Sequence, residues 1–456
     1  MKALAPLSDT WTPREAAHLL NRAGFGGTPE EVAALHALGR SKAVDSLLKP
    51  SEPMDEFPAP EWARAKSDPR SREIREEQAK LRREGRTMSA EERDRRRRQL
   101  NQKAQRLRRE YGGQLQGWWL RRMVRSKAPL REKMALFWHD HFPSSLQKVR
   151  SPRFLFRQNQ LFRRFATGNF RELTGKVVVD PAMMIYLDTA QSRKQQPNEN
   201  FAREILELFT LGEGHYRERD IKEAARAFTG YFLNRDTGVV NHVKRFWDEG
   251  EKTFLGRTGR FDGKDIVTII FEQPQAARYL PGKLWEYFVA EDPETETVDA
   301  LAEAFADADF AVGPLLRTIF LSGEFSSERS IRTRIKSPVE FLVQLCRQLE
   351  IDELAPRPAI AALTQLGQQI LMPPNVAGWD WGQAWINTNS LLARYNVAGA
   401  VCGATTPTRM QGQRPAARRD MQRRPGQGRG TPRFGALPDY QQIAPPELRE
   451  NPARLV

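Results

Sequence analysis

Three side chains that can bind a metal ion or transfer a proton lie at consecutive positions: His139, Asp140 and His141. On a regular helix, residues two apart point about 200° away from each other, so both histidines could bind one metal only where the backbone turns. Pro143 makes such a turn available. The alternative is two partly buried histidines that form hydrogen bonds at a helix C-terminus, where the helix dipole favours their protonated form.

The segment NENFAREILELFTLG predicts a second candidate site on the most regular amphipathic helix of the chain. Its polar positions recur at i, i+3, i+4 and i+7 and share one face, at Asn200, Arg203, Glu204 and Glu207. Glu204 and Glu207 could bind a divalent metal ion with the histidines, and Arg203 could orient them or bind an anionic substrate. Further binding candidates open the helix, at Asn198, Glu199 and Asn200. Such a charged face is more often simply solvated.

Three tryptophans alternate with glycine and aspartate in the segment PPNVAGWDWGQAWIN, at Trp379, Trp381 and Trp385. Exposed tryptophans could stack on a sugar ring, with Trp379 and Asp380 as binding residues. More often, such residues lock a loop onto the core. We favour packing because no second sugar-binding feature accompanies them, and Asn375 and Asp380 would then be turn and capping residues.

Several common active-site motifs are absent. The sequence contains no Walker-type phosphate loop, no dinucleotide-binding glycine fingerprint, no HExxH and no GxSxG segment. The glycines of RAGFGGTPEE could receive an anion near a helix start, although a turn that caps a helix explains them equally well. Nucleotide-binding and serine-hydrolase functions are therefore disfavoured.

The elements that position these residues are predicted to be helical. Residues 12–15, 28–31 and 337–340 each combine an N-cap, a first-turn proline and a returning glutamate. The helices that begin at Pro13 and Pro29 would end at Gly24 and Gly39, the second one with its apolar residues buried, at Val32, Leu35 and Leu38. Asp180 and Asp220 would cap two further helices. The turn sequence at 236–238 predicts one small β-hairpin within residues 231–255.

We therefore expect an all-α fold, with a single helical domain of about a dozen helices over residues 1–400. A charged helical hairpin is inserted at 61–110. Beyond residue 400 the chain is rich in Gly, Pro, Gln and Arg, which predicts a disordered basic tail over 401–456. With 39% hydrophobic residues, the 456-residue chain has ample material for a core.

The net charge of +15 is concentrated in two segments. Residues 61–110 contain 18 Lys or Arg and 10 Asp or Glu, a net of +8, and residues 401–456 contain 10 Arg and 4 acids, a net of +6. These two segments carry 14 of the 15 charges, so the remaining body is close to neutral. Because acids and bases are interspersed in the hairpin, we favour a solvated hairpin over an RNA-binding arm and do not expect nucleic-acid binding.

Two cysteines, Cys346 and Cys402, are too few for a disulfide framework or a cysteine-rich metal site. The N-terminus lacks an apolar signal-peptide core, and no segment reaches membrane-spanning length. As written, the sequence predicts a cytoplasmic protein without a membrane span.

Several long motifs resemble the signatures of the domain of unknown function 1800 family: AAHLLNRAGFG, PLREKMALFWHDHFPSS, NENFAREILELFTLG, EAARAFTGY and PPNVAGWDWG. They agree with the family in order and spacing over roughly residues 11–395. The resemblance implies a helical fold and, in many relatives, export and pairing with a neighbouring secreted protein of sulfatase-like type. It implies no established activity. Phe209 and Trp247 stand where many relatives carry histidine, so this chain departs from any metal site built from those histidines.

Two functions are compatible with these features. The first is a metal-dependent enzyme in which His139 and His141, helped by Asp140, Glu204 or Glu207, bind a divalent ion that activates water or oxygen. The second is a non-catalytic scaffold or partner protein that works with another bacterial protein. In that case the polar motifs are structural networks, and the charged hairpin and the tail recruit macromolecules.

Overall fold

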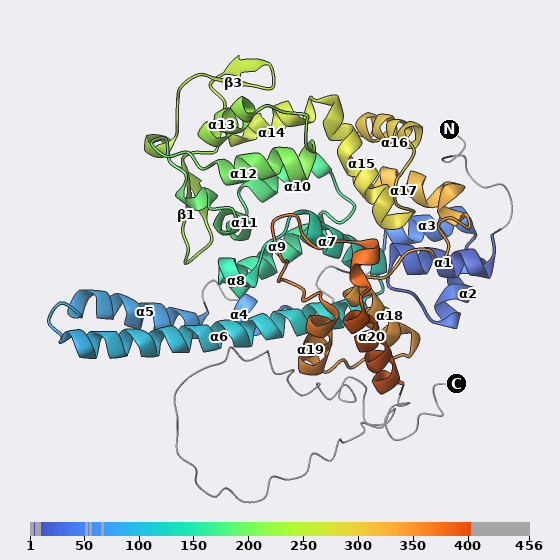
Figure 1. Ribbon diagram of the computed structural model, residues 1–456, viewed down its shortest axis with the longest axis horizontal. Helices are drawn as coiled ribbons and strands as arrows, with labels where there is room; N and C mark the ends of the chain where they lie inside the picture. The colour runs from blue at the N-terminus through green and yellow to red at the C-terminus, as the bar shows by residue number, and fades with distance from the viewer. Residues whose placement is uncertain (1–3, 5–10, 51–52, 54–56, 65–67, 403–456) are drawn as a thin grey trace, which may run out of the picture.

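The computed structural model describes residues 4, 11–50, 53, 57–64 and 68–402. Within them it contains twenty α-helices and two small antiparallel sheets, which confirms the predicted all-α class (Figure 1). The expected dozen helices was too few, because four-residue helices such as α4 (Glu61–Arg64) and α8 (Leu146–Val149) lie between the longer ones. The predicted disordered tail lies outside the described residues, which end at Cys402.

A long helical pair projects from the body at the left of Figure 1. Helices α5 (Pro69–Glu84) and α6 (Ala90–Arg125) form this arm, as the sequence predicts. The side chains of Asp68 and Ser89 cap the two helices. From Tyr111 onward α6 is largely buried in the body, so one 36-residue helix serves both the arm and the core.

The body is built around α7 (Pro129–His141), which is buried at nearly every position. It contacts α6, α1 (Pro13–Ala23), α3 (Arg40–Leu48) and α9 (Pro152–Arg164). Helix α6 ends at Arg125 and α7 begins at Pro129, because proline can begin a helix but lacks the N–H needed inside one.

The other helices form three groups around α7 (Figure 1). Near α1 and α3 lie α2 (Pro29–Ala37), α15 (Pro274–Phe288), α16 (Thr295–Asp307) and α17 (Val312–Leu321). A second group contains α10 (Phe170–Val178), α11 (Pro181–Tyr186), α12 (Glu199–Glu204), α13 (Glu218–Ala227) and α14 (Gly263–Phe271). The third contains α18 (Pro338–Gln348), α19 (Pro356–Leu366) and α20 (Thr388–Val401).

The capping predictions are largely confirmed. Capping boxes begin α1, α2 and α18, and Asp180 caps α11. The prediction for Leu38 is wrong, because α2 ends at Ala37 and the side chain is 45% exposed, while Val32 is only half-buried. Asp220 is not an N-cap: α13 begins at Glu218, and the Asp220 carboxylate accepts a hydrogen bond from the Arg217 N–H inside the first turn.

Two small β-hairpins lie beyond α13. The predicted one pairs β1 (Tyr231–Leu233) with β2 (Val240–His242). The second, which the sequence analysis missed, pairs β3 (Lys252–Phe254) with β4 (Arg257–Gly259). Its two turn residues, Leu255 and Gly256, both have positive φ, and leucine is rarely a signal for such a turn.

The predicted regular helix at 198–211 is interrupted. After α12 the backbone continues as a π-helix over Ile205–Thr210, in which the Thr210 hydroxyl donates to the Ile205 carbonyl. The wider turn changes the angular spacing on which the predicted polar stripe depends. Among the described residues, no helix combines the length and apolar character needed to cross a membrane.

Candidate functional site

His139 is held as a hydrogen-bond acceptor inside the core. Its ring lies near Trp119 and Trp379, with centroid distances of 5.4 and 5.6 Å. Its Nε2 accepts from the backbone N–H of Leu371 at 3.1 Å. Burial lowers the pKa of His139 to about 3, so the ring is neutral at pH 7. In the alternative drawn from the sequence the helix dipole favours the protonated form, but at His139 the effect of burial outweighs it.

His141 and Asp140 connect α7 to other segments of the chain. His141 Nε2 donates to the Phe209 carbonyl at 3.0 Å, and burial lowers the pKa of His141 well below its usual value. Asp140 accepts from the backbone N–H of Trp379 at 2.8 Å and from the Trp381 indole at 2.7 Å. Burial raises the pKa of Asp140 to about 6 in spite of these hydrogen bonds.

The tryptophan segment lies against the core through these contacts. Trp379 and Trp385 are buried, and Trp381 is half-buried. A Cβ at Gly378, where φ is 85°, would clash with Asp140, so glycine permits the close approach. Asn375 acts as a turn residue, whereas Asp380 is exposed, and Trp381 occupies the N-cap position of the following 3₁₀ turn without a side-chain capping hydrogen bond.

The polar residues of α12 and of the following π-helix form separate local contacts. Arg203 pairs with Glu218 at 3.0 Å near the surface, and Glu207 accepts from the Tyr216 hydroxyl at 2.6 Å. Burial, together with the charge of Glu207, raises the pKa of Glu204 to about 7. The helix is opened by a cap in which the Asn198 side chain accepts from the Asn200 N–H, and Glu199 occupies the first turn.

The described residues contain no group of three or more His, Cys, Asp and Glu side chains arranged to hold a metal ion. Phe209 packs beside His141 with a centroid distance of 6.1 Å. Metal binding by His139, His141, Glu204 and Glu207 therefore stays a prediction.

Replacing His139 by asparagine tests its structural role through pH. The folded-state pKa lies below the usual value of 6.5, so the stability that neutral His139 contributes is complete above pH 6.5 and is lost as pH falls toward 3. The difference in unfolding free energy between wild type and His139→Asn should therefore shrink by about 2 kcal/mol between pH 7.5 and pH 5. Urea unfolding at both pH values measures it, and an unchanged difference would contradict the assignment.

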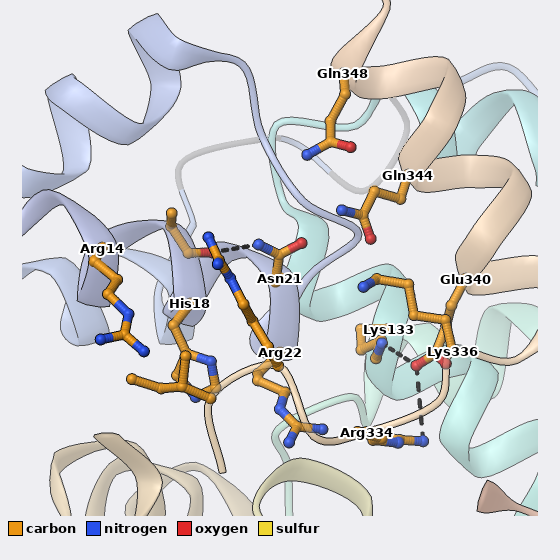
Figure 2. A pocket seen from close by; sticks show the side chains of 13 residues that line it. Arg14, His18, Asn21, Arg22, Lys133, Arg334, Lys336, Glu340, Gln344 and Gln348 are labelled. Carbon is orange, nitrogen blue, oxygen red and sulfur yellow. Dashed lines mark hydrogen bonds and ion pairs between the residues drawn. The ribbon is translucent and has the colours of Figure 1, made fainter. Parts of the chain in front are cut away.

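A second candidate site is a pocket of about 370 Å³ between α1, α18 and residues 331–336 (Figure 2). We call it the cationic pocket. Within the described part of the chain, its lining contains one carboxylate, that of Glu340, and six basic side chains, those of Arg14, Arg22, Lys133, Arg332, Arg334 and Lys336. This local excess of positive charge lies on a body whose sequence is nearly neutral.

Arg22 is a buried cation of the pocket. It lies in the last turn of α1 and is 6% exposed. Its Nη2 donates to the carbonyls of Val289 and Ser330, at 2.9 and 2.6 Å. Its Nη1 is buried and has no hydrogen-bond partner among the described residues. Burial, and then the charge of Arg334, lowers the pKa of Arg22 to about 10.

Glu340 partly neutralises the floor of the pocket. It forms an ion pair with the buried Lys133 of α7, and its carboxylate lies 3.8 Å from the Arg334 guanidinium. Burial acts to raise the pKa of Glu340, but Arg334 and Lys133 outweigh it and hold that pKa well below its usual range. Burial lowers the pKa of Lys133 to about 8, although Glu340 opposes the shift. Arg334 also lies 4.4 Å from the Tyr287 ring centroid.

Two further side chains complete the chemistry of the pocket. The half-buried Lys336 ammonium has neither an ion pair nor a hydrogen bond to any residue that the structure describes. Burial lowers its pKa; the charge of Glu340 opposes this shift, and the charges of Arg22 and Arg334 add to it. His18 donates from Nε2 to the Phe325 carbonyl at 2.8 Å. Burial, and then Arg22, lowers the pKa of His18 to about 4, so it is neutral at pH 7.

A family model described as "Protein of unknown function (DUF1800)" matches residues 18–445. The chain belongs to this family. Comparison with curated proteins and with solved structures gives no match. Two of the stretches that carry the DUF1800 resemblance line the cationic pocket: AAHLLNRAGFG supplies His18, Asn21 and Arg22, and PLREKMALFWHDHFPSS supplies Lys133.

The sequence analysis did not predict this pocket. Its residues come from three segments far apart in the chain, around positions 14–22, 133 and 331–348. The one local signal is RSIRTRIK at 329–336, which contains four bases and no acid. Such a run, directly before a capped helix, is a cue for anion binding.

Proposed function

We propose that this DUF1800 protein binds a small anionic ligand in the cationic pocket. The observation that carries the proposal is the Nη1 of Arg22, a buried guanidinium donor of a pocket-lining residue that has no hydrogen-bond partner among the residues the structure describes. Nearly all buried donors in folded proteins are satisfied, and an unsatisfied charged donor is especially costly. An oxygen atom of a carboxylate, phosphate or sulfate would satisfy it.

The balance of charge in the pocket supports the same function. Arg334 lowers the pKa of Arg22, and both lower the pKa of Lys336, so these cations repel one another. Glu340 alone among the lining residues opposes that repulsion. A bound anion would reduce it further and would stabilise the folded state by mass action.

The contacts suggest a role for each cation. Arg22, fixed by two carbonyls, would present a preorganised donor, while the Lys336 ammonium would approach the anion as a mobile charge. Lys133 and Arg334, which are held by Glu340, would contribute positive potential.

Replacing Lys336 by glutamine should lower the affinity for inorganic phosphate roughly tenfold, because one charge-assisted contact is removed. Isothermal titration calorimetry of the full chain measures the affinity. Lys264→Gln is the matched control, since Lys264 is exposed and lies outside the pocket lining. Equal phosphate affinity in wild type and Lys336→Gln would argue against the proposal, as would no binding by wild type.

A metal-dependent enzyme is the second candidate function. The observation that favours it is the raised pKa of Glu204, since a cation would relieve the cost of ionising Glu204 beside Glu207. Elemental analysis of purified wild type beside Glu204→Gln tests it. Stoichiometric metal that is lost in the folded variant would support this function, and metal at trace level in both would oppose it.

The partner-protein function concerns the arm, whose root, Trp62, Asp68 and Tyr111, is anchored by side-chain contacts. There Trp62 stacks on Tyr111 at 4.9 Å, and the Tyr111 hydroxyl donates to Asp68 at 2.9 Å. Deleting all of 61–110 would remove part of this root, so residues 76–102 should be replaced by a short linker instead. Loss of a co-purifying protein, with an unchanged melting temperature, is the result expected for a docking arm.

A further inference from the structure

Three amide side chains line the cationic pocket beside its charged residues. Figure 2 places Asn21, Gln344 and Gln348 in the upper part of the pocket, and Arg22 and Arg334 in the lower part. Asn21 comes from α1, and the two glutamines come from α18 one turn apart. The pocket therefore presents two kinds of chemistry to a ligand.

Two of these amide oxygens are buried and have no hydrogen-bond partner among the described residues, Asn21 Oδ1 and Gln344 Oε1. The orientation of Asn21 is fixed by its Nδ2, which donates to the Ala17 carbonyl at 2.8 Å and leaves Oδ1 as the free acceptor. A ligand could satisfy these two oxygens with hydrogen-bond donors, and it could satisfy Arg22 Nη1 with a hydrogen-bond acceptor.

Gly26 makes this arrangement sterically possible. Its φ is +81°, and a Cβ there would lie 3.0 Å from Gln344 Cγ and 3.3 Å from Asn21 Oδ1. A side chain at position 26 would therefore crowd both amides and strain the backbone. The glycine turn that follows α1 thus brings the two amides together.

The size and the lining of the pocket restrict the ligand. A cavity of about 370 Å³ lies in the range that holds small organic ligands and exceeds the needs of a bare inorganic anion. Of the described lining residues, only His18 has an aromatic ring, so the stacking surface that a nucleobase usually requires is missing. Hydroxyl groups can donate to amide oxygens and also accept from cationic donors.

We infer that the ligand is an anionic sugar or a similar polyol, with its phosphate or carboxylate at Arg22 and Lys336 and its hydroxyl groups at Asn21 and Gln344. This inference rests on the proposed anion binding. It adds a chemical class to the ligand and assigns separate roles to the charged and the amide side chains of the pocket.

Calorimetry on the full chain with four probes tests the inference: glucose 6-phosphate, glucuronate, glucose and inorganic phosphate. We expect one of the two anionic sugars to bind at least tenfold more tightly than inorganic phosphate, and glucose to bind weakly. Whichever anionic sugar binds identifies the charged group as phosphate or carboxylate. Gln344→Met should remove the tenfold advantage of the anionic sugar over inorganic phosphate, while the exposed control Gln195→Met should leave both affinities unchanged.

The outcomes separate the two proposals. Equal affinity for phosphate and both anionic sugars would overturn the inference about sugar and leave anion binding standing. Binding of none of the anions would overturn both. If Gln344→Met fails to fold by circular dichroism, the conservative variant Gln344→Asn, which withdraws the amide by one methylene, is used for the same comparison.

Discussion

Replacing Glu132 by glutamine should destabilise the fold by about 3–5 kcal/mol, the range found when one partner of a buried ion pair is removed. Glu132 accepts from Arg122 at 2.6 Å and from Arg163 at 2.6 and 2.8 Å. The side chains of all three residues are completely buried. Glutamine leaves both guanidinium groups in the core without the carboxylate, so much of their desolvation cost is no longer offset.

Chemical denaturation of the full chain measures this change. Glu110→Gln is the matched control, because Glu110 pairs with Arg70 at 2.6 Å at the exposed root of the arm, and its loss should cost at most about 1 kcal/mol. Similar midpoints for the two variants would show that the buried ion pair contributes little to stability. A large loss in Glu132→Gln would establish that α7 is held in place by charge as well as by apolar packing.

Replacing both Arg334 and Lys336 by glutamine should reduce phosphate affinity roughly a hundredfold or more, since two cations are removed from one small cavity. Arg14, Arg22, Lys133 and Arg332 remain beside Glu340, so the formal charge of the lining would fall from +5 to +3. Loss of the Arg334 contact with Tyr287 should cost about 1 kcal/mol of stability in addition.

Calorimetry at constant ionic strength measures the affinity of this double variant. Lys222→Gln combined with Lys264→Gln is the control, since it removes the same total charge from exposed positions outside the pocket lining. If both double variants lost affinity equally, the net charge of the whole protein would explain binding, and the cationic pocket would have no special role.

Much of the fold could be predicted because its signals are local. A threonine or serine, a proline and a glutamate within four positions specify the starts of α1, α2 and α18. The two helices of the arm begin with simpler side-chain caps, Asp68 and Ser89. The second β-hairpin was missed because its turn uses Leu255 at positive φ, which tertiary contacts impose against local preference.

The candidate site could be predicted only in part, because its decisive contacts are distant in sequence. Residue type alone made His139 a candidate metal ligand. In the structure its Nε2 already accepts a hydrogen bond from the N–H of Leu371, which lies 232 positions later in the chain. Likewise, Arg22 and Lys336 are separated by about three hundred positions and meet only in the folded chain. A net charge that is counted over a long segment does not reveal such a local cluster. Outside residues 61–110 and 401–456 the chain is close to neutral, although it contains the cationic pocket.

The central claim is that the cationic pocket binds an anion, and a crystal of the full chain soaked in tungstate tests it most directly. Anomalous diffraction locates tungsten without reference to the protein coordinates. The account predicts a strong peak with an oxygen within hydrogen-bond distance of Arg22 Nη1 and Lys336 Nζ, and loss of that peak in Lys336→Gln crystals. Tungsten bound only at surface lysines and arginines, with an empty pocket, would contradict it.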